Sequence, residues 1–316
     1  MKNIAIRPST TSPATKTSTK KFRPFHKTWR LHLMLLPAVL AALVFKYAPM
    51  PGIIMAFENF KPWLGITGSD WVGLDNFRMI FTMHGSVQVI LNTLLISVLK
   101  IVFGLLVPVA FALLLNEFRN MALKRTVQTF VYLPHFMSWV ILSGILLDVL
   151  SLDGIVNRLL TFLHIEPIMF LGDGSWFRVT VIVSDLWKEF GFSAIVFLAA
   201  LSGINPDLYE AAEIDGAGRW QQTLHITLPS LLPMMSVVFT LSLGSMLSAN
   251  FDQIYNLINP LVLQQGDIID TFVFRNFQAG QYSLAAAVGL FKSAVGFILI
   301  GCGYYGAYKW TNYRVF

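Results

Sequence analysis

Residues 205–229, NPDLYEAAEIDGAGRWQQTLHITLP, form a polar segment between two strongly apolar runs. The segment carries four carboxylates and one guanidinium, on Asp207, Glu210, Glu213, Asp215 and Arg219. The first three carboxylates follow one another at intervals of three residues, so a helix would present them on one face beside small side chains. A face of small side chains allows the close approach of another surface. The alternative interpretation is an interfacial loop whose acids are simply solvated.

Local signals in this segment predict two short helices joined by a turn. Asn205 can cap the first helix and Pro206 suits its first turn. Gly216 and Gly218 then end that helix, and a second helix is predicted over about 219–228. We expect the pair to lie against the membrane with its acidic, small-residue face free.

A second set of residues carries charge within or near the apolar runs, where charge is costly and usually functional. These residues are Lys46, Lys100, Asp185, Lys188, Glu189, Asp252 and Lys292. Asp185, Lys188 and Glu189 stand at i, i+3 and i+4, so they can pair locally or extend toward the membrane surface. Lys100 and Lys292 lie deeper, where they would suit a path for an acidic or hydroxylated solute. Pairing with the helices of a partner subunit is the alternative.

Several kinds of site are not predicted for this chain. It contains no G-x-x-x-x-G-K-[ST] phosphate loop, no His or Cys spacing typical of a metal site, and a single cysteine, Cys302. His135 is expected to be a packed, hydrogen-bonded residue. We therefore predict no catalytic residue, no metal and no cofactor on this chain. Its energy source must be another subunit or an ion gradient.

Composition indicates a polytopic, all-α membrane protein. The chain is 55% hydrophobic and 13% charged, whereas soluble domains carry about 25% charged residues. Spans need about 20 apolar residues each. Six are predicted, at roughly 32–57, 89–115, 127–149, 179–202, 232–256 and 285–308.

Counts of Lys and Arg in the connections predict the orientation. If both termini are cytoplasmic, the inner segments carry fourteen of these cations and the outer connections five. Residues 1–30 are a basic tail that we expect to be partly disordered, and residues 31–316 form the membrane domain. The polar segment, at about 203–231, is then cytoplasmic. Nucleic acid is not a predicted partner, because the cations cluster beside spans.

The polar segment resembles the EAA loop of the membrane subunits of bacterial binding-protein-dependent ABC importers. Its motif reads Glu210-Ala211-Ala212, then Gly216, then I-T-L-P at 226–229. Shorter strings resemble the carbohydrate branch, and more narrowly the permeases of the LplB type that serve polysaccharide uptake. These strings are WVGLDNF (71–77), NTLLIS (92–97), ALLLNE (112–117), YLPHFMSWV (132–140) and GLFKS (289–293). The resemblance covers roughly residues 30–316.

This resemblance implies a MetI-like importer fold with six spans in the bacterial inner membrane. In the family, the EAA loop is a coupling helix that sits in a cleft on a cytoplasmic ATPase. The implied coupling residues here are Glu210, Ala211, Ala212, Glu213, Asp215 and Gly216. The implied partners are a second, homologous permease, two ATPase subunits that bind ATP and Mg, an external solute-binding protein, membrane lipid and the oligosaccharide itself.

The substrate is left open between fragments of acidic polysaccharides, such as alginate or pectin, and neutral oligosaccharides. The candidate substrate path consists of Lys100, Asn250, Asp252, Gln253, Tyr255 and Lys292. An ion-coupled secondary carrier is the competing class, although no inverted repeat is evident. An intramembrane enzyme would need a nucleophile and base pair that the sequence does not show.

Overall fold

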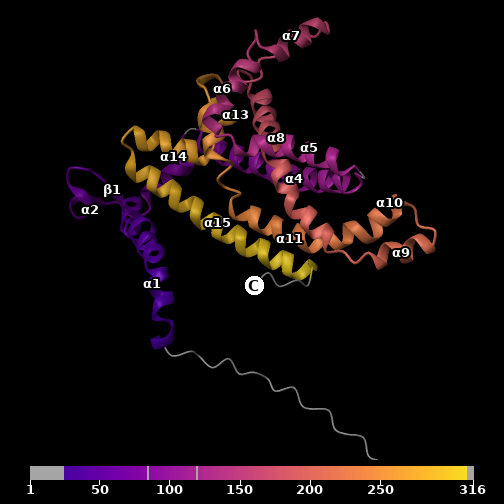
Figure 1. Ribbon diagram of the computed structural model, residues 1–316. Helices are drawn as coiled ribbons and strands as arrows, with labels where there is room; N and C mark the ends of the chain where they lie inside the picture. Colours follow the sequence, from indigo (N-terminus) through magenta and orange to yellow (C-terminus); the bar gives the residue numbers. More distant parts are fainter. Residues whose placement is uncertain (1–24, 84, 119, 312–316) are drawn as a thin grey trace, which may run out of the picture. The chain divides into compact units, whose positions relative to one another are not determined.

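The computed structural model describes residues 25–83, 85–118 and 120–311 (Figure 1). The chain divides into two compact units, Met1–Pro51 and Gly52–Phe316. The described part of the first unit contains helix α1 (Phe25–Ala42), the π-helical turn η1 (Leu43–Tyr47) and the first residues of η2 (Met50–Phe57). The predicted tail, residues 1–30, lies mostly outside the described residues, and its last six residues begin α1.

The described residues contain four helical segments that are long and apolar enough to cross a membrane: His32–Phe57, Ser86–Asn116, Arg219–Gly244 and Tyr282–Gly306. A bent pair, Met121–Phe136 with Trp139–Val149, would be a fifth if it is one span. Helix α8 (Gly174–Ser202) is long enough to cross a membrane, at 29 residues, but it contains too many charged side chains to count among these apolar segments. The all-α membrane fold is therefore confirmed, and the count of six spans is not fully confirmed.

The prediction that residues 127–149 form one continuous spanning helix was wrong. Helix α5 (Met121–Tyr132) continues into the 3-10 turn η3 (Leu133–Phe136), and α6 (Trp139–Val149) begins after a bend of 103°. Pro134 lies in the turn, and Ser138 has extended backbone and caps α6 through its Oγ, which accepts from the amide of Ile141 at 3.4 Å. Local capping thus overrides the continuous apolar pattern.

The fifth predicted span was displaced. The helix runs from α10 (Arg219–Gln222) through the π-turn η4 (Thr223–Thr227) into α11 (Leu228–Gly244), so 219–228 is no separate short helix. The chain then turns through Ala249 and Asn250, which have φ values of 44° and 64°, before α12 (Phe251–Leu257) begins. The predicted span at 232–256 therefore combines the end of one helix with a second, distinct helix.

Ordered elements fill the long connections. Strands β1 (Glu58–Asn59) and β2 (Asp70–Trp71) pair in antiparallel fashion around α2 (Gly65–Gly68), and α3 (Asp75–Thr82) follows. Asn76 secures this region, because its buried amide donates to the carbonyls of Ala56 (3.0 Å) and Glu58 (2.9 Å). The other connections hold α7 (Ile155–Phe162), η5 (Pro260–Val262), α13 (Leu263–Gly266) and α14 (Ile269–Gln278).

Within Gly52–Phe316, α4 (Ser86–Asn116) packs along α8, and α15 (Tyr282–Thr311) packs against α11 and α14 (Figure 1). Buried apolar side chains join α4, α8 and α11, among them Ala112, Phe197 and Leu231. Helix α5 approaches α8 closely at Gly191, where a Cβ atom would lie 2.6 Å from the carbonyl oxygen of Val131. These contacts hold the polar side chains described next in fixed positions between helices.

Candidate functional site

Helix α9 (Asp207–Ile214) presents the predicted acidic face to the outside of the unit. Glu210, Ala211, Glu213, Asp215 and Gly216 are all exposed, and Ala212 is half-buried. An apolar residue on this helix is exposed as well, since Ile214 keeps 87% of its surface. The surface of α9 is therefore accessible along its acidic face and at Ile214.

The ends of α9 are set by local hydrogen bonds, as the sequence predicts. The Asn205 side-chain oxygen accepts from the amide of Asp207 at 3.1 Å. At the other end, Gly216 has a φ of +78°, which a residue with a Cβ adopts only at a cost, and the amide of Ala217 donates to the carbonyl of Ala212 at 2.8 Å. The chain then reverses into α10.

Two side-chain contacts join this segment to the long helices, and the sequence did not reveal either. The hydroxyls of Tyr209 and Thr227 lie 2.9 Å apart, which links α9 to the π-turn that leads into α11. Arg219 Nη1 lies 3.1 Å from Glu117 Oε2 at the end of α4. Both charged side chains are more than half exposed, so the pair orients the segment more than it stabilises the fold. An open groove of about 880 Å³ separates the end of α4 from this segment.

Three of the predicted path residues meet in one buried polar cluster. Lys100 Nζ on α4 lies 3.5 Å from Asp185 Oδ1 on α8, donates to the carbonyl of Ala249 at 3.1 Å and contacts the side-chain oxygen of Gln253. Asn250 donates to the same Asp185 oxygen at 2.8 Å. The cluster therefore ties the start of α12 to α4 and α8.

Gln253 is wholly buried, and its amide donates to the Val181 carbonyl (2.7 Å) and the Ser184 hydroxyl (2.9 Å). Its hydrogen bonds are thus occupied within the protein. The expected local pairing among residues 185–189 is only partly found, because Asp185 pairs with Lys100 across helices while Lys188 pairs with Glu189 at 2.7 Å. His135 is packed and hydrogen-bonded as expected, 2.7 Å from Glu189 and stacked on the ring of Phe192.

The remaining path residues lie elsewhere. Lys292 on α15 is 2.5 Å from Asp270 Oδ1 on α14 and 3.2 Å from the Ser248 hydroxyl. Asp252 and Tyr255 lie on the exposed side of α12. The Tyr255 ring stacks on Phe251 at 5.2 Å and meets the edge of Phe274 at 5.1 Å. The residues of the predicted substrate path therefore lie in three separate places, which are a buried polar cluster, an ion pair and an aromatic face on α12.

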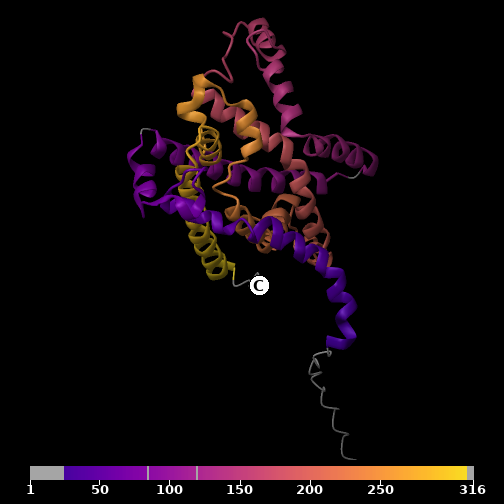
Figure 2. The same cartoon turned by 90° about the vertical axis from the view of Figure 1, so that its left-hand side faces the viewer.

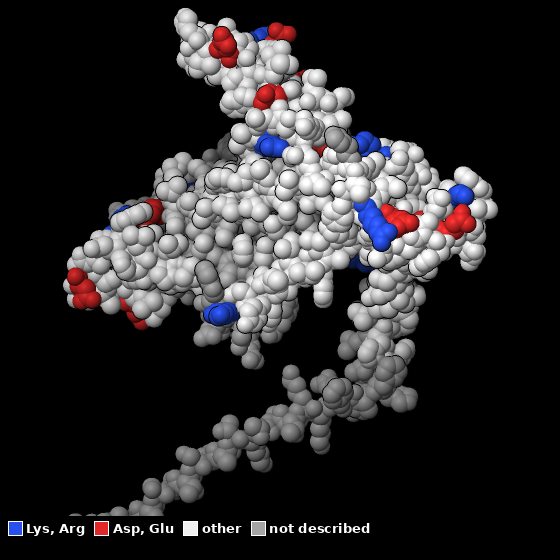
Figure 3. All heavy atoms as spheres, turned by 180° about the vertical axis from the view of Figure 1, so that it is seen from behind, with Lys and Arg blue, Asp and Glu red and all other residues white. Residues whose placement is uncertain are grey.

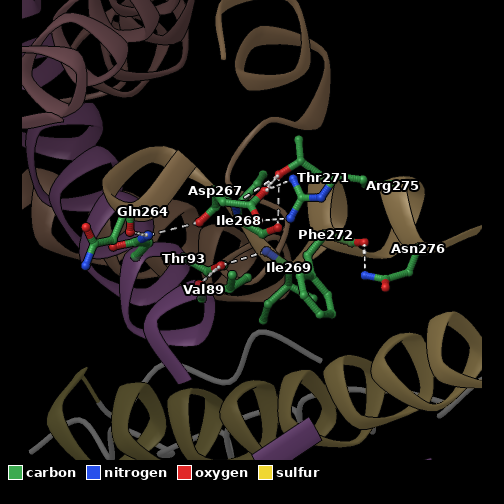
Figure 4. Close-up of polar contacts among 11 residues, drawn as sticks. Val89, Thr93, Gln264, Asp267, Ile268, Ile269, Thr271, Phe272, Arg275 and Asn276 are labelled. Atoms are coloured by element: carbon green, nitrogen blue, oxygen red, sulfur yellow. Dashed lines mark hydrogen bonds and ion pairs between the residues drawn. The ribbon is translucent and has the colours of Figure 1, made fainter. Parts of the chain in front are cut away.

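A further polar network that the sequence did not reveal surrounds Asp267, whose side chain is 3% exposed (Figure 4). Its carboxylate receives Arg275 Nη2 at 2.5 Å and the Thr271 hydroxyl at 2.7 Å. Beside it, the Thr93 hydroxyl on α4 accepts from the amide of Ile269 at 2.9 Å. The network fixes the connection before α14 to the start of α4.

Two more side chains extend this network to α8. The Asn92 amide donates to the carbonyls of Gln264 (2.9 Å) and Asp267 (3.2 Å), and Arg178 Nη2 donates to the Asn92 oxygen at 2.7 Å. Within the described ranges, no three His, Cys, Asp or Glu side chains are grouped to hold a metal ion. The polar chemistry of these helices thus consists of amide networks and ion pairs.

One face of the molecule is largely uncharged. Figure 3 shows one face on which charged side chains form small separate groups and most atoms belong to other residues. Together with the long apolar helices, this surface agrees with an integral membrane protein.

Comparisons with known proteins match this architecture. Residues 100–305 match the family described as binding-protein-dependent transport system inner membrane component. Protein LplB of Bacillus subtilis (strain 168) is 42% identical over 288 residues, which cover 90% of this chain and 91% of LplB. The polygalacturonan/rhamnogalacturonan transport system permease protein YteP of the same strain is 43% identical over 85% of each chain.

Solved structures agree with the sequence relatives. A chain of a bacterial ABC transporter involved in the import of the acidic polysaccharide alginate has a TM-score of 0.84, with 37% identity over 91% of this chain and 98% of that chain. The alginate transporter in complex with an alginate pentasaccharide-bound periplasmic protein gives 0.85, with 36% identity over 92% and 98%. An ion-coupled carrier and an enzyme are not favoured by these matches. The chain belongs to the family of binding-protein-dependent transport system inner membrane components, as a permease subunit of an ABC transporter.

Proposed function

We propose that this chain is a permease subunit of an ATP-driven importer of oligosaccharides, in particular fragments of acidic polysaccharides such as alginate. The observation that carries the substrate class is the likeness, at 36–37% identity and over 98% of those chains, to the alginate importer. YteP, at 43% identity, is named for galacturonan polymers, which are acidic as well. Neutral oligosaccharides remain the second candidate, because the named galactooligosaccharide permease GanP is also a relative, at 28% identity.

The proposed coupling surface is α9 with its C-terminal turn, made of Glu210, Ala211, Ala212, Glu213, Asp215 and Gly216. Its exposure supports docking into a groove of a separate ATPase subunit, which would bind ATP and Mg. A movement of α9 would be transmitted to α11 through the Tyr209–Thr227 contact and to α4 through the Arg219–Glu117 contact. Alternating access would then follow from rigid-body movement of the long helices.

The proposed contact with the sugar is the exposed side of α12, with Asp252, Tyr255 and the half-buried Asn250. Aromatic rings and amide or carboxylate groups suit a ring with many hydroxyls. Lys100 and Gln253 would act by holding α12 in place, since their polar atoms already contact this chain's own residues. Lys292 stands beside Asp270 and could exchange that partner for a substrate carboxylate.

The proposed assembly contains a second homologous permease, two cytoplasmic ATPase subunits and an extracytoplasmic solute-binding protein, in the bacterial inner membrane. Both termini and α9 would face the cytoplasm. The bias of fourteen cations inside against five outside supports this orientation.

The test is the charge reversal Glu210→Lys in the reconstituted transporter. We expect the stimulation of ATP hydrolysis by loaded binding protein, and oligosaccharide uptake, to fall to the unstimulated level while membrane insertion is kept. Glu166→Lys makes the same charge change on an exposed residue of an outer connection and should leave coupling unchanged. Normal stimulation in Glu210→Lys would refute the coupling role. Uptake in de-energised vesicles that contain ATP separates this function from ion-coupled transport.

A further inference from the structure

An open apolar groove of about 260 Å³ lies between the end of α6 and the first half of α8. Its walls include Leu146 and Leu150 from the α6 side and Phe170 from the following connection. The α8 wall is a stripe that runs from Trp176 to Trp187 at helical spacing. The groove belongs to neither the coupling surface nor the proposed sugar contacts.

The groove has almost nothing to offer a polar ligand. Thr180 and Ser184 are its hydroxyl-bearing residues, and both hydroxyls already have partners in the protein. Ser184 donates to the carbonyl of Thr180 at 2.6 Å and accepts from the amide of Gln253 at 2.9 Å. The Thr180 hydroxyl lies 3.5 Å from the carbonyl of Phe170. No charged residue lines the groove, so its chemistry suits a hydrocarbon chain.

The length of the groove matches one leaflet of a bilayer. Trp176 and Trp187 are eleven residues apart on a continuous helix, which at 1.5 Å per residue is about 16 Å. Half of the roughly 30 Å hydrocarbon core is about 15 Å. Trp176 lies within one turn of the Asp173 cap where α8 begins, and tryptophan is enriched at the membrane–water interface.

The element next to the groove has the form of an interfacial helix. Helix α7 projects from the rest of its unit in both ribbon views, and it carries Ile155, Leu159 and Phe162 on one side, 59–78% exposed (Figures 1 and 2). Asn157 on its other side is buried and bonds to Ile168 through both its amide and its oxygen. An apolar face held in this way suits the boundary between headgroups and acyl chains.

We propose that this groove is a binding site for one acyl chain of a membrane phospholipid, with α7 lying at the headgroup level of the same leaflet. The occupant is argued from the apolar lining, the single-leaflet length and the membrane environment of the family. Exposed Val179 and Val183 continue the groove toward the surrounding lipid, as a chain that enters from the bilayer requires.

The proposal is tested in the whole transporter, purified with its partner subunits and reconstituted in phospholipid nanodiscs. Cys302 is the only cysteine, so Cys302→Ser provides a background for a spin label at Val183→Cys. We expect the label to collide readily with oxygen and rarely with a water-soluble nickel complex. Glu166→Cys supplies the water-exposed reference and Phe297→Cys an exposed apolar reference. Protection from both reagents would show a protein partner in the groove, and ready access of nickel would show water; either result overturns the proposal.

A second measurement separates a bound chain from bulk lipid. Val183→Trp fills the groove, whereas Val140→Trp changes an exposed valine of α6 that does not line it. Native mass spectrometry should show about one phospholipid fewer retained per chain in Val183→Trp and the normal number in Val140→Trp. An unchanged number in Val183→Trp overturns the proposal, provided that its assembly and elution match the Val140→Trp control.

Discussion

Lys100 on α4 and Asp185 on α8 place Nζ and Oδ1 3.5 Å apart, with 9% and 18% of their side chains exposed. Asn250 and Gln253 complete their coordination, so the pair joins three helices. The sequence predicts Lys100 and Lys292 as part of a path for an acidic or hydroxylated solute. The structure instead gives Lys100, Lys188 and Lys292 carboxylate partners in the same chain.

Replacing one member of the Lys100–Asp185 pair should destabilise the protein more than replacing both. Asp185→Leu leaves an uncompensated buried ammonium group, which costs about 3–5 kcal/mol. The double variant Lys100→Met with Asp185→Leu should recover most of the lost stability, because no charge is left unpaired. Thermal unfolding in detergent, followed by the loss of monodisperse protein, measures the effect. Additive losses in the double variant would mean that the two groups do not interact.

In the turn after α9, substitution of Gly216 should impair the protein, whereas substitution of Gly218 should be tolerated. Gly216→Ala forces a residue with a Cβ to adopt a φ of +78°, at a cost of about 1–2 kcal/mol, although nothing crowds the new methyl group. Gly218 has an ordinary φ of −67°, so Gly218→Ala is the matched control. We expect reduced ATP-driven uptake for Gly216→Ala alone, at unchanged protein levels. Equal activity of the two variants would contradict a requirement for the left-handed turn.

The contact between α5 and α8 should depend on Gly191. A Cβ atom there would lie 2.4 Å from Val131 Cγ1 and 2.6 Å from its carbonyl oxygen, so Gly191→Ala should destabilise the protein by about 1–3 kcal/mol. Adding Val131→Ala should recover only part of the loss, because the backbone oxygen remains. Gly104→Ala on α4 meets no neighbour within 4 Å and should cause no loss of stability, since alanine is favoured over glycine inside a helix. The melting temperatures of the Gly191→Ala and Gly104→Ala variants test this prediction. An unchanged melting temperature for Gly191→Ala would show that α5 and α8 can move apart without cost.

The aromatic face of α12 should matter for transport and little for assembly. Tyr255 is 44% exposed and contacts Phe251 and Phe274 through its ring. Tyr255→Phe keeps the ring and should transport at close to the normal rate. Tyr255→Ala should lower oligosaccharide uptake by up to roughly tenfold, because loss of one aromatic contact costs about 0.5–1.5 kcal/mol and about 1.4 kcal/mol corresponds to tenfold. Trp63→Ala, which removes a 79% exposed aromatic elsewhere, is the control. Full uptake by Tyr255→Ala would exclude the face from the path.

Sequence patterns predicted the acidic helix and its ends well, because capping and the positive-φ glycine are local effects that Asn205 and Gly216 decide by themselves. They were less reliable for helix boundaries in apolar stretches. The apolar run at 127–149 contains a 103° bend before Trp139, and the run at 232–256 is broken by a turn through Ala249 and Asn250. Within such runs, every residue is compatible with a span, so hydropathy does not mark the break.

The amino-acid sequence by itself determined the membrane class, the family and the exposed acidic segment, because composition and a contiguous motif need no knowledge of distant contacts. Only the tertiary structure decided the partners of the charged and polar side chains. Lys100 with Asp185, Asp267 with Arg275 and Tyr209 with Thr227 are separated by 8 to 85 residues. Such pairs form because helix packing brings particular faces together. The sequence around one polar or charged residue does not indicate which partner will lie beside it in the fold.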